Sequence, residues 1–177
     1  MLNSYGVAIC RWIVGLVFAW SCTAKLRDVT TFSDTIRRFK LLPDHLVRLM
    51  AWVILSGEAA IMATMLIGGQ LLAWGFILAA ALLLIFCFAL LSVLLRRIQT
   101  PCNCFGASSK SPVSLFEIVR SLTFSLFAMS GYGLLYKVQG NLGTLGILDW
   151  SLAGIIAVVI VLVMVQINEI VWVFRIN

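Results

Sequence analysis

The chain has 177 residues, of which 62% are hydrophobic and only 11% are charged. A soluble domain carries about 25% charged residues, so this composition excludes an ordinary water-soluble fold. The formal net charge is +6, but the basic residues flank apolar runs and form no separate basic face. That pattern favours the lipid bilayer as partner and excludes nucleic acid. The first apolar run is too long for a cleavable signal peptide and lacks a basic start, so we expect a retained span.

Five apolar runs follow one another, each near the ~20 residues that a spanning helix needs. The expected spans cover residues 5–25, 46–67, 71–95, 114–136 and 150–173. They predict a single all-α domain over residues 1–177: a polytopic membrane helix bundle, with a four-helix core and a fifth transmembrane helix. We expect it to be a multi-pass protein of the inner (plasma) membrane.

Two connections have features of their own. Gly68-Gly69-Gln70 is the whole link between the second and third spans, so these spans must form an antiparallel hairpin. Between the first two spans, residues 31–40 place Phe32, Ile36 and Phe39 at helical spacing against basic residues. This pattern predicts a short helix lying in the membrane interface.

The basic residues predict an orientation. Most of them flank or occupy the first-to-second and third-to-fourth connections, and the other side has little beyond Lys137. The positive-inside rule then places both of these connections in the cytoplasm and the N-terminus outside. The residues concerned are Lys25, Arg27, Arg37, Arg38, Lys40, Arg48, Arg96, Arg97 and Lys110.

Cys102 and Cys104 stand one residue apart in the connection before the fourth span, between Pro101 and Gly106. Two thiols at this spacing can alternate between a dithiol and a strained, easily reduced disulfide. Such a pair closes almost no loop, so it is suited to electron transfer and not to structural cross-linking. Cys22, at the end of the first span, can bring a third thiol to the same face. Spacing alone leaves redox chemistry, metal binding and a plain tight loop as open alternatives.

Charged residues inside the spans form a second group of candidates. Counted from their shared membrane face, Glu58 lies about 16 Å deep and Arg11 about 21 Å deep, at 1.5 Å per residue. We expect the two to pair, because a lone charge at that depth is costly; the alternative is that Glu58 relays protons. Arg120 is expected to meet Glu169.

Three polar residues near the span ends are interpreted as structural. We expect Lys25 and Asp28 to be interface anchors and not catalysts. Glu117 follows Ser114 at the spacing of a capping box, which predicts the start of the fourth span.

The segment Cys102-Asn103-Cys104-Phe105-Gly106, ahead of a span that contains Arg120, resembles the Cys-x-Cys-Phe-Gly signature of the methylamine-utilisation protein MauE family. That family belongs to a wider MauE/DoxX-like group of small redox-associated membrane proteins. Ala24-Lys25-Leu26-Arg27-Asp28, Leu42-Pro43 and Glu58 extend the resemblance over roughly the first four spans. The arrangement also looks like vitamin K epoxide reductase, a four-helix bundle with a cysteine pair beside its fourth helix and a bound quinone, although this is analogy at the level of the fold.

The resemblance implies a thiol–disulfide redox accessory that supports disulfide formation or maturation of an exported, disulfide-containing client, together with a thioredoxin-like protein. If the chain is an enzyme, it is a thiol–disulfide oxidoreductase. Cys102 and Cys104 would be its exchanging pair, and a quinone is the one cofactor that the comparison raises. The remaining candidates would support redox or proton transfer (Cys22, Glu58, Arg120) or complete the motif (Phe105, Gly106, Lys25, Asp28).

Two other classes of function stay open. Thiolates at Cys102, Cys104 and Cys22 suit Cu(I) or Zn, so a bundle that binds or transports a soft metal is one alternative. The other is a structural subunit of a larger membrane complex. The redox interpretation also conflicts with the predicted orientation, because an exported client needs the cysteine pair outside while the basic residues place it inside. The sequence leaves this sidedness open.

Overall fold

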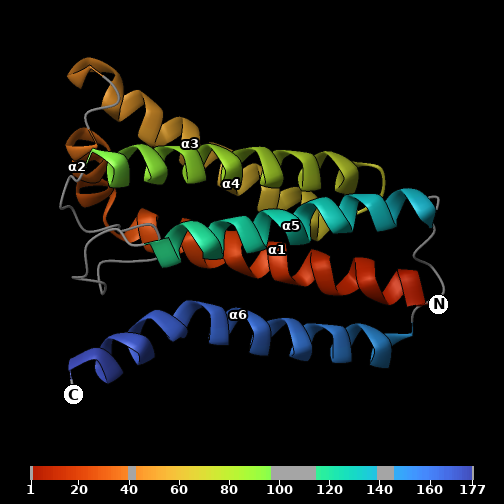
Figure 1. Ribbon diagram of the computed structural model, residues 1–177. Coiled ribbons are helices and arrows are strands. Elements are labelled where there is room, and N and C mark those ends of the chain that lie inside the picture. The colour runs from red at the N-terminus through yellow and green to blue at the C-terminus, as the bar shows by residue number, and fades with distance from the viewer. Residues whose placement is uncertain (1, 40–42, 97–114, 139–145, 177) are drawn as a thin grey trace.

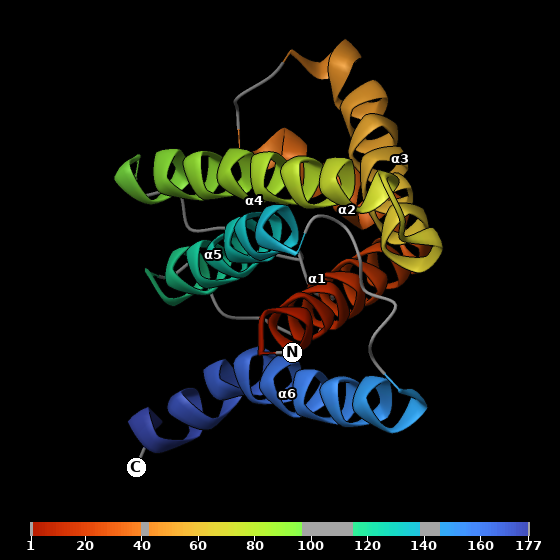
Figure 2. The same cartoon turned by 90° about the vertical axis from the view of Figure 1, so that its right-hand side faces the viewer.

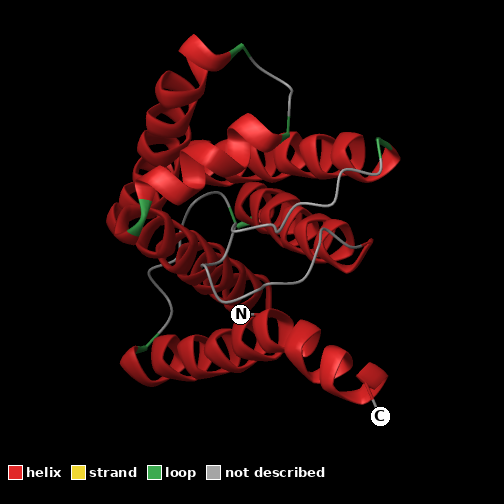
Figure 3. Cartoon of the chain, turned by 90° about the vertical axis from the view of Figure 1, so that its left-hand side faces the viewer, coloured by secondary structure: helices red, strands yellow, loops and turns green. Residues whose placement is uncertain are grey.

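The computed structural model describes residues 2–39, 43–96, 115–138 and 146–176. Within these ranges the chain forms six helices and short turns, with no strand (Figure 3). This confirms the all-α class. The helices are α1 (Leu2–Arg27), α2 (Val29–Arg38), α3 (Asp44–Ile67), α4 (Leu71–Leu95), α5 (Leu115–Lys137) and α6 (Ile147–Ile176).

Five of the described helices are long and apolar enough to cross a membrane; the exception is α2. At 1.5 Å per residue, the shortest of them, α5 with its 23 residues, reaches about 34 Å, which exceeds the ~30 Å hydrocarbon core. A helix satisfies its own backbone hydrogen bonds, which a lipid environment requires. The five predicted spans are therefore confirmed as helices capable of spanning.

The spanning helices alternate in direction along the chain (Figure 1). α1 is central and packs against α3, α5 and α6, while α4 packs against α3 and α5. Most of the apolar core lies among α1, α3, α4 and α5, with Phe18, Phe76 and Phe124 almost fully buried, and α6 adds Ala157 and Val161 from its α1-facing side. α6 lies against α1, outside this group of four (Figure 2). A four-helix core with a fifth helix is thus confirmed.

Three glycines allow a sharp turn and a close helix contact in this bundle. Gly68 and Gly69 have φ angles of 75° and 63°, in the region that favours glycine, and they turn α3 back into α4 as predicted. Gly131 lets α5 approach α4, because a Cβ there would lie 2.7 Å from the ring of Phe76.

The predicted amphipathic helix is also present, two residues earlier than expected. Asp28 is the N-cap of α2, and its side chain accepts a hydrogen bond from the Thr31 backbone N–H at 2.9 Å. Phe32 is buried against the bundle, whereas Arg37 is exposed and pairs with Asp44 at 3.1 Å. α2 therefore covers the end of the bundle at which α1 ends and α3 begins.

Candidate functional site

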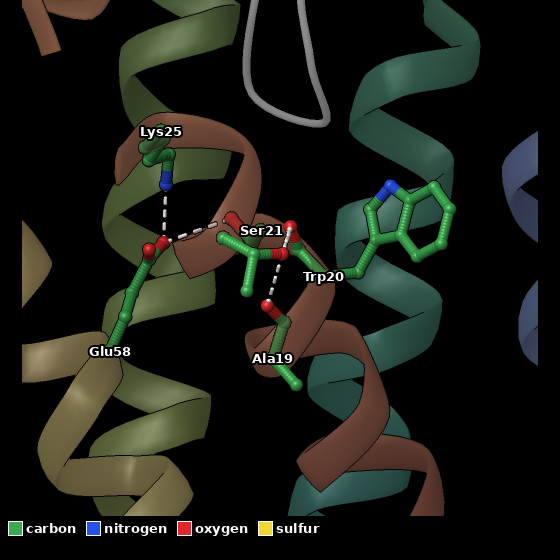
Figure 4. A network of polar contacts seen from close by, with 6 residues as sticks. Ala19, Trp20, Ser21, Lys25 and Glu58 are labelled. Carbon is green, nitrogen blue, oxygen red and sulfur yellow. Dashed lines mark hydrogen bonds and ion pairs between the residues drawn. The ribbon is translucent and has the colours of Figure 1, made fainter. Parts of the chain in front are cut away.

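A buried ion pair joins α1 to α3 near the end of the bundle that α2 covers. Lys25 is 2% exposed and Glu58 is fully buried, and the Lys25 ammonium donates to Glu58 Oε1. The Ser21 hydroxyl donates to the same oxygen at 3.0 Å (Figure 4). Two predictions are wrong here: the partner of Glu58 is Lys25 and not Arg11, and Lys25 is a buried ion-pair residue and not an interface anchor.

Aromatic rings enclose the Lys25 ammonium on its other sides. Its nitrogen lies 5.0 Å from the ring centroid of Phe32 on α2 and 4.7 Å from that of Phe86 on α4. The negative faces of these rings attract the cation, more strongly where water is excluded. Four helices thus contribute to one buried positive charge: α1 with Lys25, α3 with Glu58, and α2 and α4 with the two rings.

A second buried ion pair lies at the start of α5. Arg120 donates to Glu117 three residues earlier, and both side chains are less than one-tenth exposed. Neighbouring turns of a helix bring such residues together. The predicted contact of Arg120 with Glu169 falls outside the described side chains, and so does Ser114, the expected partner of Glu117 in a capping box.

A cavity of about 20 Å³ connects the two ion pairs. A water molecule needs about 10–15 Å³ of this kind of volume, so the cavity has room for one. Glu58 Oε2 is buried and has no hydrogen-bond partner in the part of the chain that the structure describes. A water there can bridge groups on α3 and α5 and carry a proton between them. The polar side chains that line the cavity are Ser21, Lys25, Glu58, Glu117 and Ser121.

Two described cysteines lie close to this cavity. Cys22 is 4% exposed, follows Ser21 directly and lies within electrostatic range of both Lys25 and Glu58. Cys87 on α4 is also buried, and its thiol contacts Ser121, which lines the cavity. Cys10 is buried in another part of the core.

The predicted exchanging pair, Cys102 and Cys104, lies outside the described residues, together with Phe105 and Gly106. The helices that flank this segment are described: α4 ends and α5 begins at the end of the bundle where α1 ends (Figure 1). No group of three His, Cys, Asp or Glu side chains that could hold a metal ion occurs among the described residues. A metal site that includes Cys102 and Cys104 stays a prediction.

Asp28 is a helix cap facing water. Hydrogen bonds lower the pKa of its carboxyl to about 2: first the Thr31 hydroxyl, then the Thr31 backbone N–H and the Thr30 hydroxyl. The carboxylate is therefore ionised at any physiological pH. Its role in the described structure is to start α2, which in turn brings Phe32 over Lys25.

Three residues that line the cavity between the two ion pairs were not identified as site residues from the sequence: Ser21, Phe86 and Glu117. Ser21 carried a usable signal, since it lies four residues before Lys25 and so on the same face of α1. Phe86 carried none, because it is one apolar residue within a uniformly apolar span. Glu117 was noticed only as a possible cap, and its burial beside Arg120 depends on how α5 packs against α4.

Comparison with known proteins assigns the family. The model of the family described as "Methylamine utilisation protein MauE" matches residues 3–124, more than half of the chain. The chain belongs to the MauE family. The match includes Lys25, Glu58, Cys102, Cys104 and Arg120, and it ends before α6.

Two relatives agree with this assignment. The methylamine utilization protein MauE of Paracoccus denitrificans is 36% identical over 150 residues, which cover 82% of this chain and 80% of the relative. The protein of the same name from Paracoccus versutus is 30% identical over 144 residues, covering 81% of this chain and 77% of the relative. No solved structure matches the chain.

Proposed function

We propose that this MauE-family chain is a plasma-membrane thiol–disulfide exchange protein that matures an exported client. Cys102 and Cys104 are its exchanging pair. The names of the two relatives connect them with methylamine utilisation, and we extend that process to this chain. The client is then a disulfide-containing protein of the same process, and a thioredoxin-like protein is the redox partner.

One observation carries the proposal. The Cys102-Asn103-Cys104-Phe105-Gly106 segment joins α4 to α5 at the same end of the bundle as the buried cluster around Lys25 and Glu58. Burying charges inside a membrane is expensive, and such residues commonly serve in binding or proton transfer. Here they lie at the end of the bundle where α4 ends and α5 begins, and these are the two helices that the thiol-bearing segment joins in the sequence.

The exchange is balanced in atoms and electrons. A thiolate of the client attacks the Cys102–Cys104 disulfide, which gives a mixed disulfide and one free thiol of the pair. The second client thiol then breaks the mixed disulfide, so the client leaves oxidised and the pair leaves as two thiols. The disulfide of the thioredoxin-like protein reoxidises the pair by the same two steps and takes up the two electrons.

Each step moves a proton, because the attacking thiol loses one and the leaving thiolate gains one. Glu58 and Glu117 border one water-sized cavity at this end of the bundle, so they can hold or pass that proton. Cys22, a third thiol, is buried within electrostatic range of Glu58. These contacts support the roles expected for Cys22 and Glu58; Arg120 contributes by holding Glu117 through their ion pair.

The side of the membrane on which the pair works follows from the client. We propose that it faces outward, although Arg27, Arg48 and Arg96 lie at the same end of the bundle. Lys25 no longer counts towards this positive face, because Glu58 neutralises it inside the protein. Labelling by a membrane-impermeant maleimide in intact cells would support the outward orientation, and labelling only after lysis would contradict it.

Single-cysteine variants test the exchange. In a single-cysteine variant, the remaining thiolate can attack the disulfide of the thioredoxin-like protein or, in the reverse direction, that of an oxidised client. No second cysteine of the pair is then present to resolve the mixed disulfide, so Cys102→Ser or Cys104→Ser should trap a covalent, reductant-sensitive complex. The complex should be visible on non-reducing gels and identifiable by mass spectrometry as a client or a thioredoxin-like protein. The double variant should trap nothing.

Cys22→Ser is the internal control in both single-variant backgrounds. If Cys22 resolves the mixed disulfide, its replacement should increase the amount of trapped complex; if not, the amount should stay the same. The proposal fails if neither single variant traps a partner and the double variant still supports client maturation.

A further inference from the structure

A further charged residue, Arg11, lies on α1 towards the end of the bundle opposite to the Lys25–Glu58 ion pair. Its surroundings differ from those of that pair. Its Nε donates to the Met65 carbonyl at 2.6 Å, and its Nη2 donates to the Leu66 carbonyl at 2.9 Å. These carbonyls belong to the last turn of α3, which has no further helical donors and carries the negative end of the helix dipole. Arg11 therefore caps α3 from α1.

Arg11 also contacts α6. Its guanidinium carbon lies 5.1 Å from the centroid of the Trp150 ring. The neighbouring acidic residue, Asp149, is engaged by the Tyr5 hydroxyl and by the Gly146 backbone N–H. No carboxylate pairs with Arg11 within the part of the chain that the structure describes. Its positive charge is thus available to an anion from outside the protein.

The Arg11 guanidinium has N–H groups that no described residue accepts from. It carries five N–H groups in a planar fork, and two of them have acceptors among the described residues. The fork geometry suits the oxygens of a phosphate, which it can bind through two parallel hydrogen bonds. The carbonyls of α3 hold one edge of the fork in place.

A cleft of about 410 Å³ opens beside Arg11. It lies between α1, α3 and α6, and apart from Arg11 its walls are almost entirely apolar, among them Trp12, Leu16 and Met62. This volume falls within the range of small-molecule sites, which combine apolar walls with a few polar groups. Trp12 and Leu66 line the cleft and are exposed on the outer surface of the bundle. The cleft is therefore open towards lipid.

We propose that this cleft binds one anionic phospholipid, with the phosphate on Arg11 and an acyl chain along the apolar walls. The occupant must combine one negative group with a long apolar part, and it must reach the cleft through the membrane. An anionic phospholipid meets these conditions. Trp150 beside Arg11 agrees with a headgroup position, because tryptophan is enriched at the membrane–water interface.

A redox quinone fits this cleft less well. Reaction of a quinone with thiols needs contact between the ring and a sulfur atom, and no cysteine lines the cleft among the described residues. Cys22 lies eleven residues further along α1, about 16 Å away at 1.5 Å per residue. The lipid would instead add a link between α3 and α6, which do not pack extensively against each other.

The test uses the full chain, purified in detergent and stripped of lipid. Phosphatidylglycerol and phosphatidylcholine with identical acyl chains are added separately, and retained lipid is counted by native mass spectrometry. We expect one retained phosphatidylglycerol per chain and about tenfold weaker retention of phosphatidylcholine. Both lipids carry the phosphate, but the choline group of phosphatidylcholine adds a second positive charge beside the Arg11 guanidinium, which lowers its affinity. Equal retention of the two lipids would overturn the proposal.

Two variants test the charge of Arg11 and the volume of the cleft separately. Arg11→Gln should abolish the preference for phosphatidylglycerol, whereas Arg48→Gln, which removes an exposed charge at the other end, should preserve it. Because Arg11→Gln also removes the α3 cap, Ala19→Leu provides a second test: it fills the cleft and should reduce retention with Arg11 intact.

Competing occupants give distinct results. Stabilisation by inorganic phosphate alone, equal to that by phosphatidylglycerol, would contradict a lipid site. Displacement of phosphatidylglycerol by a quinone at equal concentration would also contradict it. Unchanged retention in both Arg11→Gln and Ala19→Leu would place any bound lipid elsewhere and overturn the assignment.

Discussion

Removing either member of the buried Lys25–Glu58 pair should destabilise the protein strongly and unequally. Lys25→Met leaves the Glu58 carboxylate buried with only the Ser21 hydrogen bond, and losing one partner of a buried ion pair costs about 3–5 kcal/mol. Glu58→Gln leaves the Lys25 ammonium between the rings of Phe32 and Phe86, which continue to stabilise it. We therefore expect Glu58→Gln to cost about 1–2 kcal/mol less than Lys25→Met.

The double variant Lys25→Met/Glu58→Leu should recover most of this loss. Apolar side chains of similar volume can replace a buried ion pair at little net cost, because no charge has to be desolvated. We expect its free energy of unfolding to lie within about 2 kcal/mol of wild type. With Lys25→Met and Glu58→Leu as the two single variants of the cycle, this implies a coupling of about 3 kcal/mol or more between the two positions.

Equilibrium unfolding in mixed micelles, titrated with sodium dodecyl sulfate, measures these differences. Arg37→Gln is the matched control, since its ion pair with Asp44 is exposed and should contribute little. Additive losses in the double variant would refute the reasoning, and so would a Glu58→Gln loss larger than that of Lys25→Met. The stable Lys25→Met/Glu58→Leu protein can then be combined with Cys104→Ser: loss of the trapped complex would show that the ion pair also serves the exchange.

Two further predictions concern the turn and the cap. Gly68→Ala should cost about 1–3 kcal/mol, because φ is +75° and the added Cβ meets the Arg11 guanidinium at 3.0 Å; Gly69→Ala, with open space around it, should cost less in the same unfolding assay. Asp28 has a lowered pKa, so its cap on α2 is fully present above the unfolded-state value of about 3.9 and is lost as the pH falls through about 2. The protection factor of the Thr31 amide in hydrogen exchange, relative to an unstructured peptide at the same pH, should therefore stay high at pH 4 and fall towards pH 2. Asp28→Ala should lack that protection at pH 4, and equal protection in both proteins would contradict the capping role.

The architecture was predictable because lipid permits few solutions. A run of about 20 apolar residues must become a helix, and a link as short as Gly68-Gly69-Gln70 can only connect antiparallel neighbours. The amphipathic pattern of Phe32, Ile36 and Phe39 likewise allowed only one face of α2 to be buried. In each case a single physical requirement determined the result. The backbone had to form its own hydrogen bonds in lipid, or one apolar face of a helix had to be buried.

The pairing of charges could not be predicted in the same way. Counting residues from the membrane face assumed that the end of α1 lies level with the start of α3, which brought Arg11 opposite Glu58. In the structure Ser21 lies level with Glu58 and Arg11 with Met65, so the two helices are shifted along their axes relative to that count. Helix register and tilt depend on packing between helices, and uniformly apolar spans carry little information about them.

The redox state of Cys102 and Cys104 in living cells shows whether this pair exchanges between a disulfide and two thiols. A Cys10→Ser/Cys22→Ser/Cys87→Ser variant retains only this pair among the five cysteines of the chain. Cells are quenched with acid and free thiols are alkylated with a high-mass maleimide. The disulfide form of the pair then gains no added mass, and the dithiol form gains two. The account predicts a mixture of both states, a shift to two added masses after brief reduction with dithiothreitol, and return to the mixture once the reductant is removed. Two added masses under every condition would mean that the pair never forms a disulfide, and would contradict the proposed exchange.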